Sequence, residues 1–108
     1  MRKGKDTSPK RGERNPIPEK EIELILFVAD DEPNSLKAKE NLVEINRHYF
    51  KGKAKIRIVD VMEDFRKALE NDVLVTPCLL VVQPPLRSLI IGNLSDPSQL
   101  LATIKFRE

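Results

Sequence analysis

Only a few side chains of this 108-residue chain are of types that do covalent or metal chemistry. There is one cysteine, Cys78, and one histidine, His48, so an internal disulfide, a CxxC redox pair and a multi-cysteine or histidine-rich metal centre are excluded. Cys78 begins an apolar run, which predicts a buried and unreactive thiol. His48 stands between Arg47 and Tyr49 without a second ligand, and we expect it at the surface.

Three consecutive carboxylates, Asp30, Asp31 and Glu32, are followed by Pro33 and Asn34. Their spacing is not that of a calcium loop, whereas an acidic residue before a proline is typical of a helix start. We therefore expect this cluster to cap a helix and to bind no metal. The chain also has no glycine-rich phosphate loop and no nucleophile elbow. These absences favour a binding protein without a cofactor over an enzyme.

The hydrophobic pattern predicts the elements that position these residues. Strands are expected at 22–28, 55–61, 78–82 and 87–91, and helices at 35–50 and 63–71, with a last helix from 97 onward that Ser95 or Asp96 caps. The residues expected to face inward are those at helical spacing: Ala38, Leu42, Ile45 and Tyr49, flanked by Leu36, Val43 and Phe50, then Phe65, Ala68 and Leu69, and finally Leu100, Leu101 and Ile104.

The order of these elements is βαβαββα. A right-handed crossover makes the first two strands parallel, and the short link at 83–86 makes the last two an antiparallel hairpin. This predicts an α/β domain with a mixed four-stranded sheet, the thioredoxin-like topology. In thioredoxin-like enzymes the thiols sit between the first strand and first helix, where this chain has no cysteine. Pro77, after Thr76, is at the position where thioredoxin-like domains have a structural cis-proline.

One alternative function remains open from the sequence: a thioredoxin-like redox protein that uses Cys78 alone.

The net charge of +2 divides unevenly along the chain. Residues 1–20 have a net charge of +4 with three prolines and two apolar residues, so we expect a basic, disordered extension; residues 21–108 form one domain with a net charge of −2. The interrupted charges favour a solubilising extension over a nucleic-acid-binding arm. No apolar run is long enough to span a membrane and no signal peptide is evident, which favours a cytoplasmic protein.

Five strings of residues together resemble the KaiB family of circadian-clock proteins. They are Phe27-Val28-Ala29, Pro33-Asn34-Ser35, Ile58-Val59-Asp60-Val61, Thr76-Pro77 and the stretch 83–95. The resemblance spans residues 23–104. It implies a non-enzymatic regulator that binds a hexameric, RecA-like KaiC-type ATPase and modulates its phosphorylation cycle, in a circadian clock or a clock-derived timing or stress-response system. The apolar content of 40% on a small domain also favours a homo-oligomer, dimer or tetramer.

Members of this family are known in two folds, the thioredoxin-like one and an oligomeric ground-state fold, βαββααβ, with a rearranged C-terminal half. Thr103 and Lys105 replace a family Gly and Asp, and they favour a helix that ends near them. We therefore expect the thioredoxin-like fold to dominate. The same resemblance indicates four partner-binding residues: Lys37, Lys55, Arg57 and Arg87. Departures at Val73 and Ser88 remove two basic residues of the family pattern.

Overall fold

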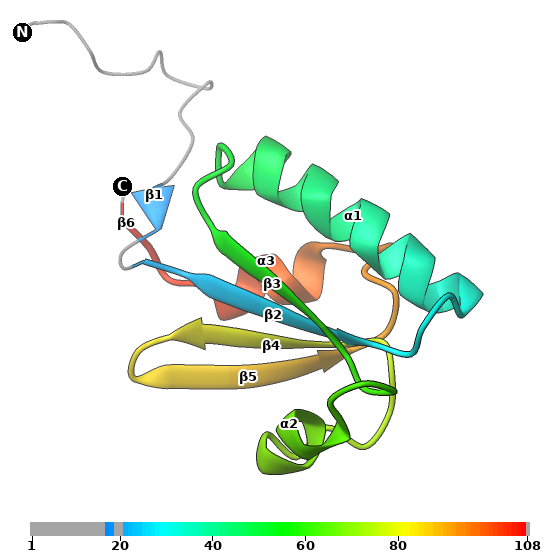
Figure 1. Cartoon of the computed structure of the whole chain (residues 1–108). Coiled ribbons are helices and arrows are strands. Elements are labelled where there is room, and N and C mark those ends of the chain that lie inside the picture. The colour runs from blue at the N-terminus through cyan, green and yellow to red at the C-terminus, as the bar shows by residue number, and fades with distance from the viewer. Residues whose placement is uncertain (1–16, 19–20, 108) are drawn as a thin grey trace, which may run out of the picture.

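The computed structural model describes residues 17, 18 and 21–107 (Figure 1). Their elements are β1 (Ile17–Pro18), β2 (Glu23–Val28), α1 (Pro33–Tyr49), β3 (Lys55–Asp60), α2 (Phe65–Glu70), β4 (Cys78–Gln83), β5 (Leu86–Ile91), α3 (Ser98–Thr103) and β6 (Phe106–Arg107). From β2 to α3 the order matches the predicted one, with boundaries shifted by a few residues.

Four strands form one sheet in the order β3-β2-β4-β5. β2 is parallel to β3 and antiparallel to β4, and β4 and β5 form an antiparallel hairpin. The predicted α/β class and mixed thioredoxin-like sheet are therefore confirmed. Because residues 86–103 run strand then helix, the structure has the thioredoxin-like arrangement and not the ground-state alternative.

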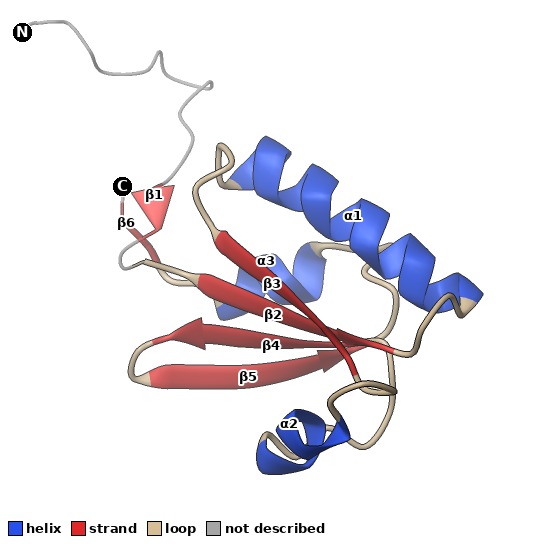
Figure 2. Cartoon of the chain, in the orientation of Figure 1, coloured by secondary structure: helices blue, strands red, loops and turns tan. Residues whose placement is uncertain are grey.

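The helices cover the two faces of the sheet unequally (Figure 2). Successive side chains of a strand point to opposite faces. Leu24, Leu26 and Leu79 therefore join a core with residues of α1 and α3 such as Leu42 and Leu100. On the other face Ile25, Phe27, Val59, Cys78 and Leu80 form a smaller core with Ala68 of α2 and Val73. We call these two sides the α1/α3 face and the α2 face.

The first helix is held at both ends by local bonds. The Glu32 carboxylate accepts the backbone N–H groups of Asn34 (3.1 Å) and Ser35 (3.0 Å), and Pro33 occupies the first turn. At the other end the Gly52 N–H donates to the Asn46 carbonyl (2.9 Å) from a backbone with φ of 75°. Only glycine adopts that φ without strain.

The apolar stripe of α1 is narrower than predicted. Ala38, Leu42 and Ile45 are buried, and so is Phe50 after the helix. The prediction was wrong for Leu36, Val43 and Tyr49, which are exposed. The contact between one helix and a sheet covers little more than a single row of side chains, so residues at the margins of the stripe stay in solvent.

The two short helices differ in how well the sequence predicted them. In α2 only Ala68 is buried, so the inward placement of Phe65 and Leu69 was wrong. In α3, Leu100 and the following Ile104 are buried and Leu101 packs against the same core, as predicted. The N-cap residue of α3 is Pro97, while the Asp96 carboxylate accepts the N–H of Ser98 (3.0 Å).

A second, two-stranded pairing lies beside the sheet and was not predicted. β1 is antiparallel to β6, with Ile17 opposite Arg107 and Pro18 opposite Phe106. Two residues of the basic N-terminal extension are thus joined to the C-terminal segment. The expectation of disorder for the rest of residues 1–20 lies outside the described residues.

Candidate functional site

The junction between β2 and α1 is the place where a thioredoxin-like enzyme has its thiols. In this chain its side chains instead cap the N-terminus of α1. Glu32 is occupied by the α1 amides, and the Ser35 hydroxyl accepts the N–H of Ala29 (3.1 Å). The Asp30 N–H donates to the Asp60 carboxylate (3.2 Å) at the end of the neighbouring strand. Within the described part of the chain no group of three or more His, Cys, Asp or Glu side chains could hold a metal. The capping role predicted for the acidic cluster is confirmed at Glu32.

The Cys78 thiol is buried inside the domain. Cys78 is the first residue of β4, lies in the α2-face core and is 2% exposed. Burial raises the pKa of its thiol above the ordinary value, because an apolar environment disfavours the thiolate. The Thr76–Pro77 peptide bond before it is cis, and so is Pro84–Pro85 in the following turn, which the sequence did not predict. His48 is exposed and stands edge-on to Tyr49, with ring centroids 4.7 Å apart.

The most distinctive surface of the described chain is an apolar depression beside α2. Its volume is about 280 Å³, and we call it the α2 groove. Four of its residues are large, apolar and exposed: Phe65 (67%), Leu69 (60%), Leu74 (86%) and Val75 (48%). The groove is lined by Val61, Phe65, Ala68, Leu69, Val73, Leu74, Val75 and Thr76. Contiguous exposed apolar surface on a small domain makes the α2 groove the candidate binding site.

The local chain path explains why these side chains are exposed. After α2, the Val73 N–H donates to the Ala68 carbonyl (2.9 Å), which folds the chain back along the helix. Val73 and Ala68 fill the space against the sheet, and the segment continues to the cis Thr76–Pro77 bond. Phe65 and Leu69 are left on the outer side. A signal for this was present in the sequence, since residues 61–75 contain more large apolar side chains than one short helix can bury.

Three of the four predicted partner-binding residues share the face that carries the α2 groove. Across the sheet, Lys55, Glu23, Val82 and Arg87 form one register row, and Arg57 pairs with Ile25 in the next. Since residues in register point to the same side, the basic side chains lie on the α2 face, at its two opposite edges. Their role in binding stays a prediction.

These basic residues already have polar neighbours. Arg57 forms an ion pair with Glu23 (3.4 Å), and the Arg87 guanidinium donates to the Asn71 side chain at the end of α2. Lys37 is exposed on α1, on the other side of the sheet. The structure therefore groups Lys55, Arg57 and Arg87 by face and leaves Lys37 apart from them.

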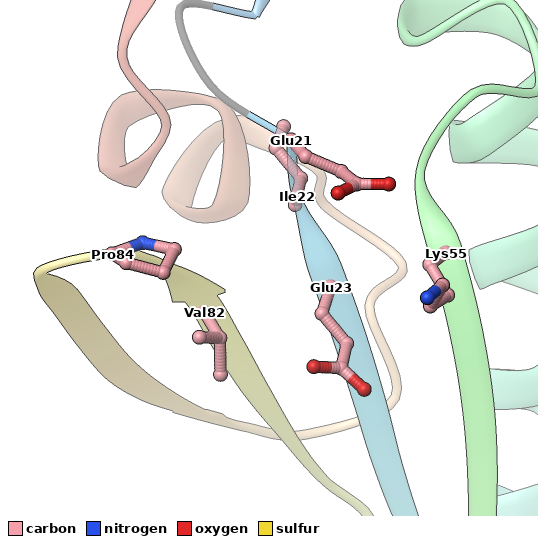
Figure 3. A pocket seen from close by; sticks show the side chains of 6 residues that line it. All are labelled: Glu21, Ile22, Glu23, Lys55, Val82 and Pro84. Atoms are coloured by element: carbon pink, nitrogen blue, oxygen red, sulfur yellow. The ribbon is translucent and has the colours of Figure 1, made fainter.

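A second hollow, of about 310 Å³, lies where β4 ends, at the opposite end of that strand from Cys78. Figure 3 shows Glu23 between Val82 and Lys55 on adjacent strands, with Glu21 just before β2. The described residues that line it carry opposite charges and include no cysteine, histidine or serine.

The two residues expected to favour the thioredoxin-like fold lie at the end of α3. Thr103 is the last helical residue, and its hydroxyl donates to the Gln99 carbonyl (2.9 Å). The position expected for Lys105, at the helix C-terminus, was wrong: the chain turns to extended backbone at Ile104, and α3 has no basic residue in its last turn. Their effect on the balance of folds stays a prediction.

Among the described residues no helix is both long and apolar enough to cross a bilayer.

Comparison with known proteins identifies the relatives of this chain. The KaiB domain model matches residues 25–105. The chain is 38% identical over 84 residues to the circadian clock oscillator protein KaiB of Prochlorococcus marinus (strain MIT 9211), covering 78% of this chain and 74% of the relative. It is 38% identical over 78 residues to that of Trichodesmium erythraeum (strain IMS101), covering 72% and 75%.

Solved structures of similar shape include thioredoxins. Oxidised mitochondrial thioredoxin 3 of Saccharomyces cerevisiae superimposes with a TM-score of 0.64 at 20% identity, over 81% of this chain and 79% of that one. The thioredoxin of Fasciola hepatica gives 0.63 at 13%, over 77% of each chain. At such low identity the likeness extends to the fold alone. The sequence matches, placed on a thioredoxin-like sheet without a reactive thiol, show that the chain belongs to the KaiB family.

Proposed function

We propose that this chain is a non-enzymatic regulator that binds a hexameric KaiC-type ATPase and alters its phosphorylation cycle. Membership of the KaiB family supports a role among clock proteins. The observation that carries the proposal is the α2 groove, because it supplies a surface for a protein partner. The fold itself has no cysteine between β2 and α1, where thioredoxin-like enzymes have theirs. The pathway is a circadian clock or a timing or stress-response system derived from one.

The composition of the α2 face suits a protein partner. The groove provides apolar area, which drives most protein association. Lys55, Arg57 and Arg87 lie on the same face and can attract an acidic surface before the apolar contact forms. An apolar centre with charges at its margin is the usual anatomy of a protein interface.

The redox alternative finds no support at Cys78. A catalytic thiol must reach its substrate and must ionise near neutral pH. Cys78 is buried, and burial raises its pKa. The single-cysteine enzyme is therefore disfavoured on both counts.

The test compares two exposed apolar residues on opposite faces. Leu69 on α2 and Val43 on α1 are each 60% exposed, so a charge at either position disturbs folding little. Leu69→Asp and Val43→Asp variants are passed over an immobilised KaiC-type ATPase, and its phosphorylation is followed with time. We expect Leu69→Asp to lose capture and the effect on phosphorylation, and Val43→Asp to keep both.

Equal capture of the two variants would contradict the α2 groove as the binding site. Absence of capture for the unsubstituted chain would contradict the function itself. Light scattering of the free chain adds a second readout, because it tests whether the predicted dimer or tetramer forms through the same apolar surface. If Leu69→Asp changed only the oligomeric state, the groove would be a contact between copies of this chain.

A further inference from the structure

One polar side chain, Gln83, is buried on the apolar α1/α3 face, and membership of the KaiB family does not explain its burial. Gln83 is the last residue of β4 and is 3% exposed. By alternation it follows Leu79 and Val81 on the apolar side of the strand. Among the described residues only Ser35 is a second buried polar side chain, and its hydroxyl is used at the start of α1.

Both polar groups of the Gln83 amide bond to the backbone of one residue. Its Nε2 donates to the Lys105 carbonyl (2.9 Å), and its Oε1 accepts the Lys105 N–H (2.8 Å). The side chain thus pairs with extended backbone as a neighbouring strand would, although residue 105 belongs to no strand of the sheet. A buried amide is stable only when both groups are bonded, so the burial of Gln83 and the docking of residue 105 require each other.

The bonded residue joins two other anchored positions. Ile104, just before it, is buried in the same core as Ile22 and Leu100. Just after it, β6 pairs with β1, and Figure 1 shows these two strands side by side near the C-terminus. A single side chain on β4 therefore lies at the centre of the contacts that tie the C-terminal segment to the sheet and, through β6, to the N-terminal extension.

We propose that Gln83 is a latch that holds the C-terminal segment 104–107, and with it β1, against the end of the sheet. When the latch opens, the segment and β1 leave together, while β2, β3, β4 and β5 stay paired. Opening exposes the apolar surface under Ile104 and frees the basic extension from its attachment. The proposal is independent of the partner proposed above, since it concerns the α1/α3 face and the chain ends.

The experiment measures amide hydrogen exchange by NMR on the full chain and on Gln83→Met and Gln83→Glu variants. Methionine keeps the length and removes both bonds; glutamate keeps an acceptor for the Lys105 N–H and removes the donor. We expect the Lys105 amide to exchange about tenfold faster or more in Gln83→Met. In Gln83→Glu at neutral pH we expect at least as large a factor, because the buried carboxylate cannot donate to the Lys105 carbonyl and is costly to desolvate. The amide of Leu26 in the central strand should keep its rate.

Two results would overturn the latch. One is a Lys105 amide that exchanges in the unsubstituted chain as fast as in an unfolded peptide. The other is a Gln83→Met variant in which the Lys105 and Leu26 amides accelerate by the same factor, since that is loss of global stability. If Gln83→Met does not fold, Gln83→Asn replaces it, with the same amide one methylene shorter. We then expect carboxypeptidase to trim the C-terminus faster than in the unsubstituted chain, and an unchanged rate refutes the proposal.

Discussion

The two faces of the sheet use apolar residues for different purposes. On the α1/α3 face, a 17-residue helix and a second helix cover the strands, and residues such as Leu24, Leu26 and Leu42 are completely buried. On the α2 face, a helix of six residues covers part of the sheet, and its own Phe65 and Leu69 are in solvent. The same residue types are therefore buried on one side and partly exposed around α2 on the other.

This difference separates two properties that are often confounded in small domains. Truncation of a buried leucine removes transfer free energy and leaves a cavity, whereas truncation of an exposed leucine does neither. Stability and partner binding should then respond to substitutions on different faces. The following predictions test that separation, beginning with the largest expected effect.

A matched pair of leucine truncations gives the largest contrast. Leu42→Ala should lower the free energy of unfolding by about 2–5 kcal/mol, because Leu42 is fully buried on the α1/α3 face. Leu69→Ala should change it by less than about 0.5 kcal/mol. Urea denaturation of both variants measures the difference. Similar losses in the two would mean that Leu69 contributes to the stabilising core.

Charge reversal at both edges of the α2 face should weaken partner binding. In the Arg57→Glu, Arg87→Glu double variant, we expect the association rate with a KaiC-type ATPase to fall by about tenfold or more at low salt. The loss should shrink as salt is added. Lys37→Glu, on the other side of the sheet, should have a smaller effect. Surface plasmon resonance at two salt concentrations compares the unsubstituted chain, the double variant and Lys37→Glu. Unchanged binding of the double variant would refute a role of Arg57 and Arg87 in binding.

Loss of the cap on α1 should have an intermediate effect on stability and none on binding. Glu32→Ala removes the acceptor of the Asn34 and Ser35 amides, and we expect a loss of about 0.5–2 kcal/mol in the free energy of unfolding. Thermal or urea unfolding measures it. Glu32→Asp, which keeps a shorter acceptor, should recover part of the loss. A Glu32→Ala variant as stable as the unsubstituted chain would show that the cap contributes nothing.

The smallest effect concerns the pH dependence that Cys78 adds to stability. Burial raises the pKa of Cys78, so the folded chain keeps the thiol proton at pH values where the unfolded chain, with a thiol pKa of about 8.5, has lost it. The stability from the neutral thiol is complete below about pH 8.5 and is lost as the pH rises through the folded pKa.

Between about pH 7 and about pH 10, the free energy of unfolding measured with urea should therefore fall more steeply for the unsubstituted chain than for Cys78→Ala, which has no thiol to titrate. The difference between the two proteins isolates Cys78 from other groups that titrate in this range. Rapid alkylation of Cys78 at neutral pH would contradict both this prediction and the buried position of the thiol.

Local patterns along the chain were sufficient for most of the fold. The apolar run at 22–28 and the alternation at 55–61 each predicted a strand, and the acidic residues before Pro33 predicted a helix start. The count of one cysteine excluded dithiol chemistry without any structure. These inferences succeed because strand alternation, helix capping and cysteine number depend on residues close in sequence or on composition alone.

Tertiary structure alone decided the features that join distant residues. Helical spacing placed Phe65 and Leu69 inward, but Val73 folds back onto Ala68 and takes the place against the sheet. The bonds from Gln83 to Lys105 join residues 22 positions apart, and β1 and β6 come from opposite ends of the chain. No periodicity carries that information. Both features depend on the packed chain as a whole. Packing decides which apolar side chains fill the space against the sheet, and it decides which backbone groups bond to the buried amide of Gln83.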